Sequence, residues 1–505
     1  MNKFLNKIAA ADNVTLTENG GIALKSTMDK VYDMFALGGA YRRRSDEDCI
    51  LLFKNAFEED PELALKCLFY IRDCRGGQGE RRFFRVVLKW LAEKHPEIVK
   101  ANLDNIAEYG RYDDLFVLFD TPVELSMVKM IHEQLILDMK CKTPSLISKW
   151  MPSINTSSAE TRKLANRFRS LMDLSAKTYR QILSTLRNKI NILETLMSQN
   201  RWDEIEFDKI PSKAGLKYRN AFARRDIIAK RYEQFIKDEK TQVNAKVLYP
   251  YEIVAAAAKG CSWGWGQGGY HFDDLDSLER ETLEKYWNNL PDYMEGNPAK
   301  MMCVVDTSGS MVSREAASPI NVAIALGMYC AERIGRPFKD HFISFSSRPQ
   351  LIKIEGIDFV DKVQRIYRKN LCENTNLEAT FDLIYNIACF SDVSKEDVPD
   401  TLVVISDMEI DAGSTFGWNN TKHRVKTMME QQREKWAKAG LRMPHLVYWN
   451  VASHNQNKFL DDGPGVTYVS GASPVIFKSV LKGVTGKDLM YDILNGERYA
   501  AIKLK

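Results

Sequence analysis

Three oxygen-bearing side chains follow a short apolar run at a spacing suited to holding a divalent cation. The run has the composition of a fully buried strand (Met301–Val305). Directly after it come Asp306, Ser308 and Ser310, and a helical pattern begins near Pro319. Ligands of an open α/β sheet bind at the carboxyl ends of its strands, where these three residues would lie. Their oxygens suit Mg²⁺, which prefers octahedral oxygen coordination and keeps positions open for water or a partner's carboxylate.

Two later stretches add further oxygen ligands. Thr375 precedes an amphipathic segment and offers a hydroxyl from a second loop, while Asp407 follows another apolar run (Thr401–Ser406). We therefore expect Mg²⁺ or another divalent cation to be bound by Asp306, Ser308, Ser310, Thr375 and Asp407. Such an ion would either capture a partner's acidic group or only tie three loops together.

A catalytic use of the same region is the less favoured alternative. Glu409 and Asp411 form an acidic pair that could support metal-dependent hydrolysis. A phosphatase of the haloacid-dehalogenase type would need a second aspartate where Ser308 stands. The seven histidines are scattered without a Ser-His-Asp grouping. We therefore predict that the protein is not an enzyme and has no catalytic residues.

The elements that would position the metal ligands alternate between strand and helix after about residue 300. We expect strands at 301–305, 341–345, 402–406, 446–451 and 466–469. We expect helices at 320–334, 360–367, 377–387, 424–439 and 474–481. This alternation predicts an α/β doubly wound sheet with helices on both faces.

The preceding part of the chain has the pattern of amphipathic helices separated by Pro or Gly. Clear examples are 46–57, 62–72, 80–94, 98–109, 123–139 and 216–237. Successive helix pairs favour an all-α ring or solenoid of HEAT-like repeats, whose units bury their apolar faces only by stacking. A large irregular helical domain is the alternative.

Composition places the chain among soluble multidomain proteins. At 505 residues it is too long for one core, and its hydrophobic content of 45% is ordinary. No apolar run approaches the ~18 residues of a membrane span, and the N-terminus lacks a signal-peptide pattern. The nine cysteines include no C-x-x-C pair, so we expect reduced thiols in a cytoplasmic protein.

Positive charge is concentrated in one block. Residues 151–247 hold 20 Lys and Arg against 11 Asp and Glu, whereas the whole chain carries only +4. Such a block is typical of a polyanion site, although a solvated helix face would look similar. The candidate RNA-binding residues are Arg162, Lys163, Arg167, Arg169, Lys177, Arg180, Arg187 and Lys189.

Two Gly-containing stretches contribute three more basic candidates. Arg75 and Arg81 flank the Gly-rich segment 76–79, and Arg111 follows Gly110. Both stretches have the pattern of a helix end followed by a new helix start; a phosphate contact is the alternative.

The order of the five candidate ligands resembles that of a von Willebrand factor A domain. They follow as Asp-x-Ser-x-Ser, then Thr, then Asp, each at a strand or loop end. The resemblance implies a metal-ion-dependent adhesion site at the five residues named above. A basic helical part followed by such a domain resembles the Ro autoantigen (TROVE) family, and more narrowly a Ro-like family of bacteria and phages. This second resemblance rests on the order and size of the two parts, on the positive charge of the helical part, and on the stretches 75–82 and 109–114.

The Ro resemblance implies a helical ring that binds single-stranded RNA ends, with small structured RNAs on its outer face. We expect an N-terminal arm (1–27), a TROVE-like RNA-binding domain (28–295), an A-like domain (296–484) and a tail that packs back (485–505). The predicted function is therefore non-catalytic binding of small non-coding or misfolded RNA, by a monomer that does not bind membranes. A partner protein would supply an acidic side chain to the metal; an interaction scaffold without RNA is the alternative.

Overall fold

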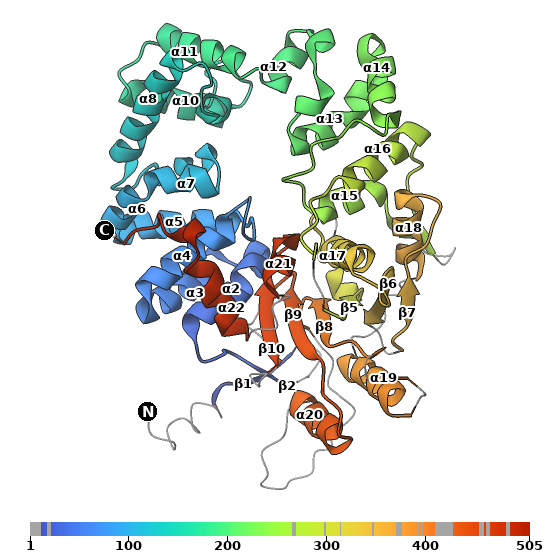
Figure 1. The fold of residues 1–505 in the computed structure, drawn as a ribbon. Helices are drawn as coiled ribbons and strands as arrows, with labels where there is room; N and C mark the ends of the chain where they lie inside the picture. The colour runs from blue at the N-terminus through green and yellow to red at the C-terminus, as the bar shows by residue number, and fades with distance from the viewer. Residues whose placement is uncertain are drawn as a thin grey trace.

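The computed structural model describes residues 12–17, 22–264, 269–296, 299–313, 315–345, 348–369, 376–390, 393–394, 397–409, 428–453, 459–460, 465–480 and 485–504. A mostly helical N-terminal part is followed by a mixed, mainly parallel sheet, as expected. Figure 1 shows the helices following an arch whose two ends meet at the sheet.

The large sheet has six strands in the order β10-β9-β8-β5-β6-β7. Their bounds are β5 (Met301–Asp306), β6 (His341–Phe345), β7 (Leu351–Lys353), β8 (Thr401–Ser406), β9 (His445–Asn450) and β10 (Val466–Ser470). All neighbouring pairs are parallel except β6 and β7. The five predicted strands are confirmed. Sequence reasoning missed β7 because this three-residue edge strand buries only Ile352 and has no apolar run.

Helices alternate with the strands of the sheet, as predicted. They are α17 (Pro319–Arg333), α18 (Phe359–Lys369), α19 (Leu377–Phe390), α20 (Met428–Lys438), and α21 (Phe477–Val480) after the short turn η7 (Pro474–Ile476). Residues 424–427 of one predicted helix lie outside the described residues. Helix α17 contacts β5, β6 and β8 as well as a helix of the arch, α15 (Pro250–Ala257). Being covered on two sides, α17 is apolar along nearly its whole length.

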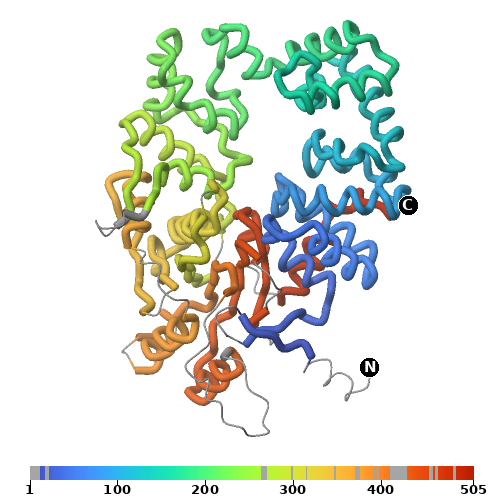
Figure 2. Tube along the Cα trace, turned by 180° about the vertical axis from the view of Figure 1, so that it is seen from behind, coloured from blue at the N-terminus to red at the C-terminus, as the bar shows by residue number. Residues whose placement is uncertain are grey.

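The arch begins with α2 (Lys30–Leu37) and its 3₁₀ extension η1 (Gly38–Arg43). It continues through α3 (Asp46–Glu59), α4 (Pro61–Arg72), α5 (Arg82–Lys94), α6 (Pro96–Ala101), α7 (Leu103–Tyr109), η2 (Tyr112–Leu118), α8 (Glu124–Lys140), α9 (Ile147–Trp150), α10 (Ala159–Leu171), α11 (Ala176–Lys189) and α12 (Leu193–Ser198). It ends with η3 (Trp202–Glu204), η4 (Phe207–Lys209), α13 (Ser212–Arg224), α14 (Asp226–Lys237), α15 and α16 (Ser277–Asn288). Figure 2 shows the same arch from behind.

Two helices predicted as continuous are each broken once, and these predictions were wrong. The segment 98–109 divides at Asn102, whose side-chain amide donates to the carbonyls of Ile98 and Lys503 (2.8 and 2.6 Å) instead of continuing a helix face. The segment 216–237 divides at Arg225, which is extended (φ −90°, ψ 107°). The break lets α13 and α14 fold against each other, so that Phe222 packs on the Tyr232 ring.

The two ends of the arch are joined through the sheet. At one end α15 contacts α17, and at the other α2 and η1 contact β10. The Tyr32 hydroxyl accepts from the Tyr468 backbone N–H (2.8 Å), and the backbone N–H of Gly39 donates to the Ser470 hydroxyl (3.1 Å). In the N-terminal arm, β1 (Val14–Leu16) and β2 (Ile22–Leu24) form an antiparallel pair.

The segment after the sheet returns to the first helices. Helix α22 (Gly486–Leu494) contacts α2, α4 and β10, and the turn η8 (Glu497–Tyr499) contacts α4. Figures 1 and 2 both show this red segment beside the blue helices. Arg498 pairs with the fully buried Asp73 through two hydrogen bonds, and the Tyr499 hydroxyl donates to the same carboxylate (3.0 Å).

Candidate metal and nucleic-acid sites

The carboxyl ends of β5 and β8 lie side by side because these strands are parallel neighbours. The connection after β5 leads to β6 on one side, whereas β8 leads to β9 on the other, so this edge is a topological switch point. Asp306 ends β5 and is fully buried, and Asp407, directly after β8, is 2% exposed. The structure thus brings two predicted metal ligands to the place where α/β sheets bind ligands.

Hydroxyl groups surround the Asp306 carboxylate. The backbone N–H of Ser308 donates to Asp306 Oδ1 (2.9 Å), and the Ser406 hydroxyl donates to Oδ2 (2.5 Å). The hydroxyls of Ser308 and Ser310 are 3.0 Å apart. Ser310 is exposed, so the loop reaches solvent on that side. Sequence reasoning missed Ser406; its position at the end of a buried strand, directly before Asp407, was the available signal.

Burial raises the pKa of the Asp306 carboxyl, and the charge of Asp407 raises it further. A divalent cation held between the two side chains would replace this repulsion by attraction. The donor set of carboxylates and hydroxyls therefore fits Mg²⁺ chemically.

Thr375 of the predicted metal site lies outside the described residues. Asp411, of the alternative hydrolytic pair, also lies outside them. Glu409 is buried, and its backbone N–H donates to Asp407 Oδ1 (3.1 Å). In the described ranges, no three His, Cys, Asp or Glu side chains gather in a way that could hold a metal. A metal at this edge would need hydroxyls and water for its remaining positions.

The Gly-rich loop (residues 73–81) caps helix α4. The backbone N–H groups of Gln78 and Glu80 donate to the carbonyls of Tyr70 and Ile71 (3.1 and 2.8 Å). Those of Arg75 and Gly76 donate to the Asp73 carboxylate (2.9 and 3.1 Å). The predicted helix end and turn is confirmed, and these N–H groups are occupied rather than directed at a phosphate.

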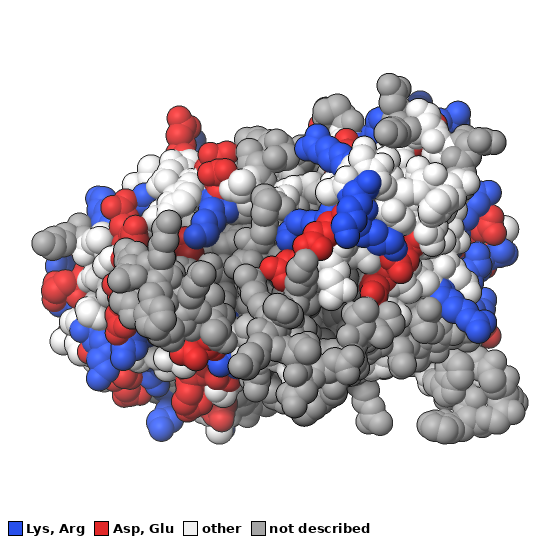
Figure 3. Space-filling model, turned by 90° about the horizontal axis from the view of Figure 1, so that it is seen from below, with Lys and Arg blue, Asp and Glu red and all other residues white. Residues whose placement is uncertain are grey.

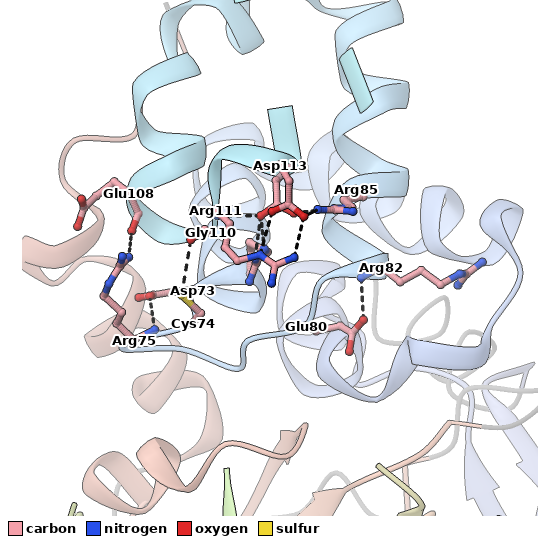
Figure 4. A network of polar contacts seen from close by, with 12 residues as sticks. Asp73, Cys74, Arg75, Glu80, Arg82, Arg85, Glu108, Gly110, Arg111 and Asp113 are labelled. Carbon is pink, nitrogen blue, oxygen red and sulfur yellow. Dashed lines mark hydrogen bonds and ion pairs between the residues drawn. The ribbon is translucent and has the colours of Figure 1, made fainter. Parts of the chain in front are cut away.

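Arg75 and Arg111 both form contacts within the protein. Arg75 bonds the Glu108 carbonyl, and Arg111 donates to both oxygens of Asp113 (2.9 and 2.7 Å) while its guanidinium lies 4.1 Å from the centre of the Trp150 ring. Figure 4 shows Arg85 and Arg111 converging on Asp113.

Behind this cluster lies the fully buried Asp114. It accepts from Arg72 Nε (2.8 Å), Arg85 Nε (2.6 Å) and the backbone N–H of Arg111 (3.0 Å). Arg81, in contrast, is exposed.

The eight basic candidates of α10 and α11 differ from this network because most of them have no acidic partner among the described residues. Among them only Arg167 forms an ion pair with a described residue, contacting Asp120 and Glu124 (2.7 and 2.6 Å). Four of the others donate to neutral acceptors, mostly backbone carbonyls: Arg162, Arg169, Arg180 and Lys189. Arg187 donates to the carbonyls of Ser148 and Met151, and for Lys163 and Lys177, both exposed, the described part of the chain offers no ion-pair partner.

Charge is distributed differently on the lower end of the molecule. Figure 3 shows acidic and basic side chains interspersed on the described part of that face. Positive charge without an ion-pair partner among the described residues is thus present on α10 and α11, whereas charges of both signs are mixed on the lower face.

Two family models match the chain. Residues 17–114 and 147–297 match a domain of unknown function, DUF2828, and residues 300–495 match another, DUF7788. An uncharacterised protein of Acanthamoeba polyphaga mimivirus is 27% identical over 93% of this chain and 85% of its own length.

Among solved structures, the crystal structure of the Ro (RSR) protein of Deinococcus radiodurans is similar with a TM-score of 0.46 and 12% identity. The alignment covers 91% of this chain and 100% of that one. Within the described residues, no helix has the length and apolarity that crossing a bilayer requires.

Proposed function

We propose that this chain is a cytoplasmic, non-catalytic RNA-binding protein similar to Ro proteins. It binds single-stranded segments of small or misfolded RNAs, and helices α10 and α11 carry the contact. The observation that supports this most is that, of the eight basic candidates on these helices, all but Arg167 have no ion pair with a described residue. Unneutralised cations favour a polyanion, because each phosphate contact releases counterions into solution.

The proposed ligand is a single strand. The basic residues are divided between α10 (13 residues) and α11 (14 residues), which are joined by a turn. Single strands are recognised by basic surfaces that follow the backbone, with sequence-tolerant contacts to the bases. The proposal therefore predicts strong salt dependence and little sequence preference.

Fluorescence anisotropy with an end-labelled, unstructured RNA tests this proposal. If roughly four to six phosphates are contacted, log Kd should rise with log salt concentration with a slope of about 3 to 4. A matched DNA hairpin of the same length serves as the duplex control and should bind more weakly. A slope near zero, or no RNA binding at about 50 mM salt, would refute the proposal.

We further propose that Asp306, Ser308, Ser310 and Asp407 bind Mg²⁺, with Thr375 as the fifth ligand. The two buried carboxylates at the switch point support this site. An ion held by few protein carboxylates keeps open positions, so an acidic side chain of a partner protein can complete its coordination. The alternative is an ion that only joins the loops of this domain.

Mg²⁺ should raise the melting temperature of the wild-type chain, and Asp306→Ala should abolish that response. Free Mg²⁺ at about 100 times its Kd contributes about 2.7 kcal/mol to folding. Differential scanning fluorimetry with Mg²⁺ or with a chelator measures the effect. Asp400→Ala is the matched control, since this exposed aspartate precedes the opposite end of β8. An equal Mg²⁺ response in wild type and Asp306→Ala would contradict the site.

A further inference from the structure

A polar cavity of about 350 Å³ lies between the segment 153–155, helix α11 and helix α12. Its only charged lining residues are Arg180 and Arg187; of the described residues that line it, none is acidic. A second cavity of similar size, about 360 Å³, lies among α13, α14 and α16. There three basic residues face three acidic ones, Glu233, Asp276 and Glu279, so its charge is balanced. The α11 cavity is therefore the better candidate for an anion.

Arg187 contributes a charge that its surroundings do not neutralise. Its guanidinium donates to the carbonyls of Ser148 and Met151 (2.9 and 2.7 Å) and to the Ser153 hydroxyl (2.8 Å). All three acceptors are neutral, and burial lowers the pKa of this arginine. A partly buried cation without a carboxylate partner is stabilised by an anionic ligand.

Arg180 lies on the same helix and is exposed. Among the described residues, its only acceptor is the backbone carbonyl of Ala176 within its own helix (3.2 Å). That weak local contact leaves most of its five donors available for a phosphate, which Arg can bind in a two-pronged geometry.

The remaining polar lining consists of amides and hydroxyls. Asn155, Asn188 and Gln199 supply amides, and Ser184 and Thr195 supply hydroxyls. An Asn or Gln amide presents a donor and an acceptor side by side, which matches the edges of nucleobases. Ile154 and Leu183 add apolar lining that suits the face of a base. A volume near the lower end of small-molecule sites suits one nucleotide unit.

We propose that this cavity binds a single nucleoside 5′-phosphate unit. The phosphate contacts Arg180 and is also attracted by the positive charge of Arg187. The side-chain amides that line the cavity contact the base. The unit is either a free nucleotide or one nucleotide of a bound RNA strand; in the second case the inference rests on the proposed function.

Isothermal titration calorimetry with AMP and UMP tests the site, with adenosine and inorganic phosphate as partial probes. The full chain is compared with Arg180→Gln, Asn188→Ala and the control Arg365→Gln. The control removes one arginine charge from α18, at an exposed residue outside the cavity. We expect Arg180→Gln and Asn188→Ala each to weaken nucleotide binding about tenfold. Arg365→Gln should leave nucleotide binding unchanged, and adenosine and phosphate should each bind more weakly than AMP.

The outcomes separate this inference from the proposed function. If AMP and UMP do not bind, or if all three variants lose binding equally, the nucleotide site is refuted, whatever the salt-dependent RNA assay shows. If nucleotides bind with the expected variant pattern but RNA does not bind, the cavity is a free-nucleotide site and the proposed function fails. If both bind, and Arg180→Gln weakens the binding of a 5′-phosphorylated RNA more than the control Arg365→Gln does, the strand supplies the unit.

Discussion

Asp114→Ala is expected to lower the free energy of unfolding by about 3–5 kcal/mol. The carboxylate is fully buried and accepts from Arg72, whose side chain is only 3% exposed, and from Arg85. Removing it leaves the Arg72 guanidinium charged, buried and without its carboxylate. It also removes the acceptor for the Arg111 backbone N–H that begins η2. The loss exceeds that of an ordinary surface ion pair because the remaining charge cannot reach water.

Urea unfolding followed by far-UV circular dichroism measures this loss. Asp113→Ala is the matched control: its carboxylate pairs with Arg85 and Arg111 but is 19% exposed, so we expect a loss of about 1 kcal/mol or less. Asp114→Asn keeps an acceptor and should fall between the two. Equal losses in the two alanine variants would show that burial of Asp114 does not set the cost.

The second large effect concerns RNA. Replacing four basic residues of α10 and α11 by Gln should weaken single-stranded RNA binding about 100-fold at about 100 mM salt. The four are Arg162, Lys163, Arg169 and Arg180, all without an ion pair to a described residue. The salt slope should fall by about 0.7 for each phosphate that the variant no longer neutralises. Anisotropy at several salt concentrations measures both quantities.

The matched control removes the same number of charges from paired lysines. Lys54, Lys100, Lys129 and Lys353 each form an exposed ion pair with a glutamate near in sequence. Their replacement by Gln should change RNA affinity by less than about threefold, since these charges are already neutralised. Equal effects in the two quadruple variants would mean that net charge, and not α10 and α11, governs binding.

The strands of the sheet could be predicted because each central strand is buried on both faces and is therefore a continuous apolar run. The same runs placed Asp306 and Asp407 at strand ends, and neighbouring parallel strands then bring them together. Helix breaks were harder to predict. Asn102 ends its helix because of a contact with Lys503, which no local pattern reveals.

Roles of individual arginines could not be assigned from sequence. Charge alone groups Arg167 and Arg187 with the other basic residues of the block 151–247. Only coordinates show that Arg167 pairs with Asp120 and Glu124, whereas Arg187 holds the carbonyls of residues 148 and 151. Arg75 likewise bonds the Glu108 carbonyl, and Arg111 lies over the Trp150 ring; both partners are distant in sequence. Charge density was visible in the sequence, but the neutralisation of each charge depends on tertiary contacts.

The pairing of Asp73 with Arg498 spans 425 residues and constrains how the protein forms during synthesis. While the chain emerges from the ribosome, helix α4 carries an acid whose eventual counter-ion has not yet been translated. Domains often fold as soon as they are made, but the first helices here complete their packing only when the C-terminal segment arrives. A stalled or shortened nascent chain would expose this unfinished junction, and we expect chaperones to bind it preferentially there.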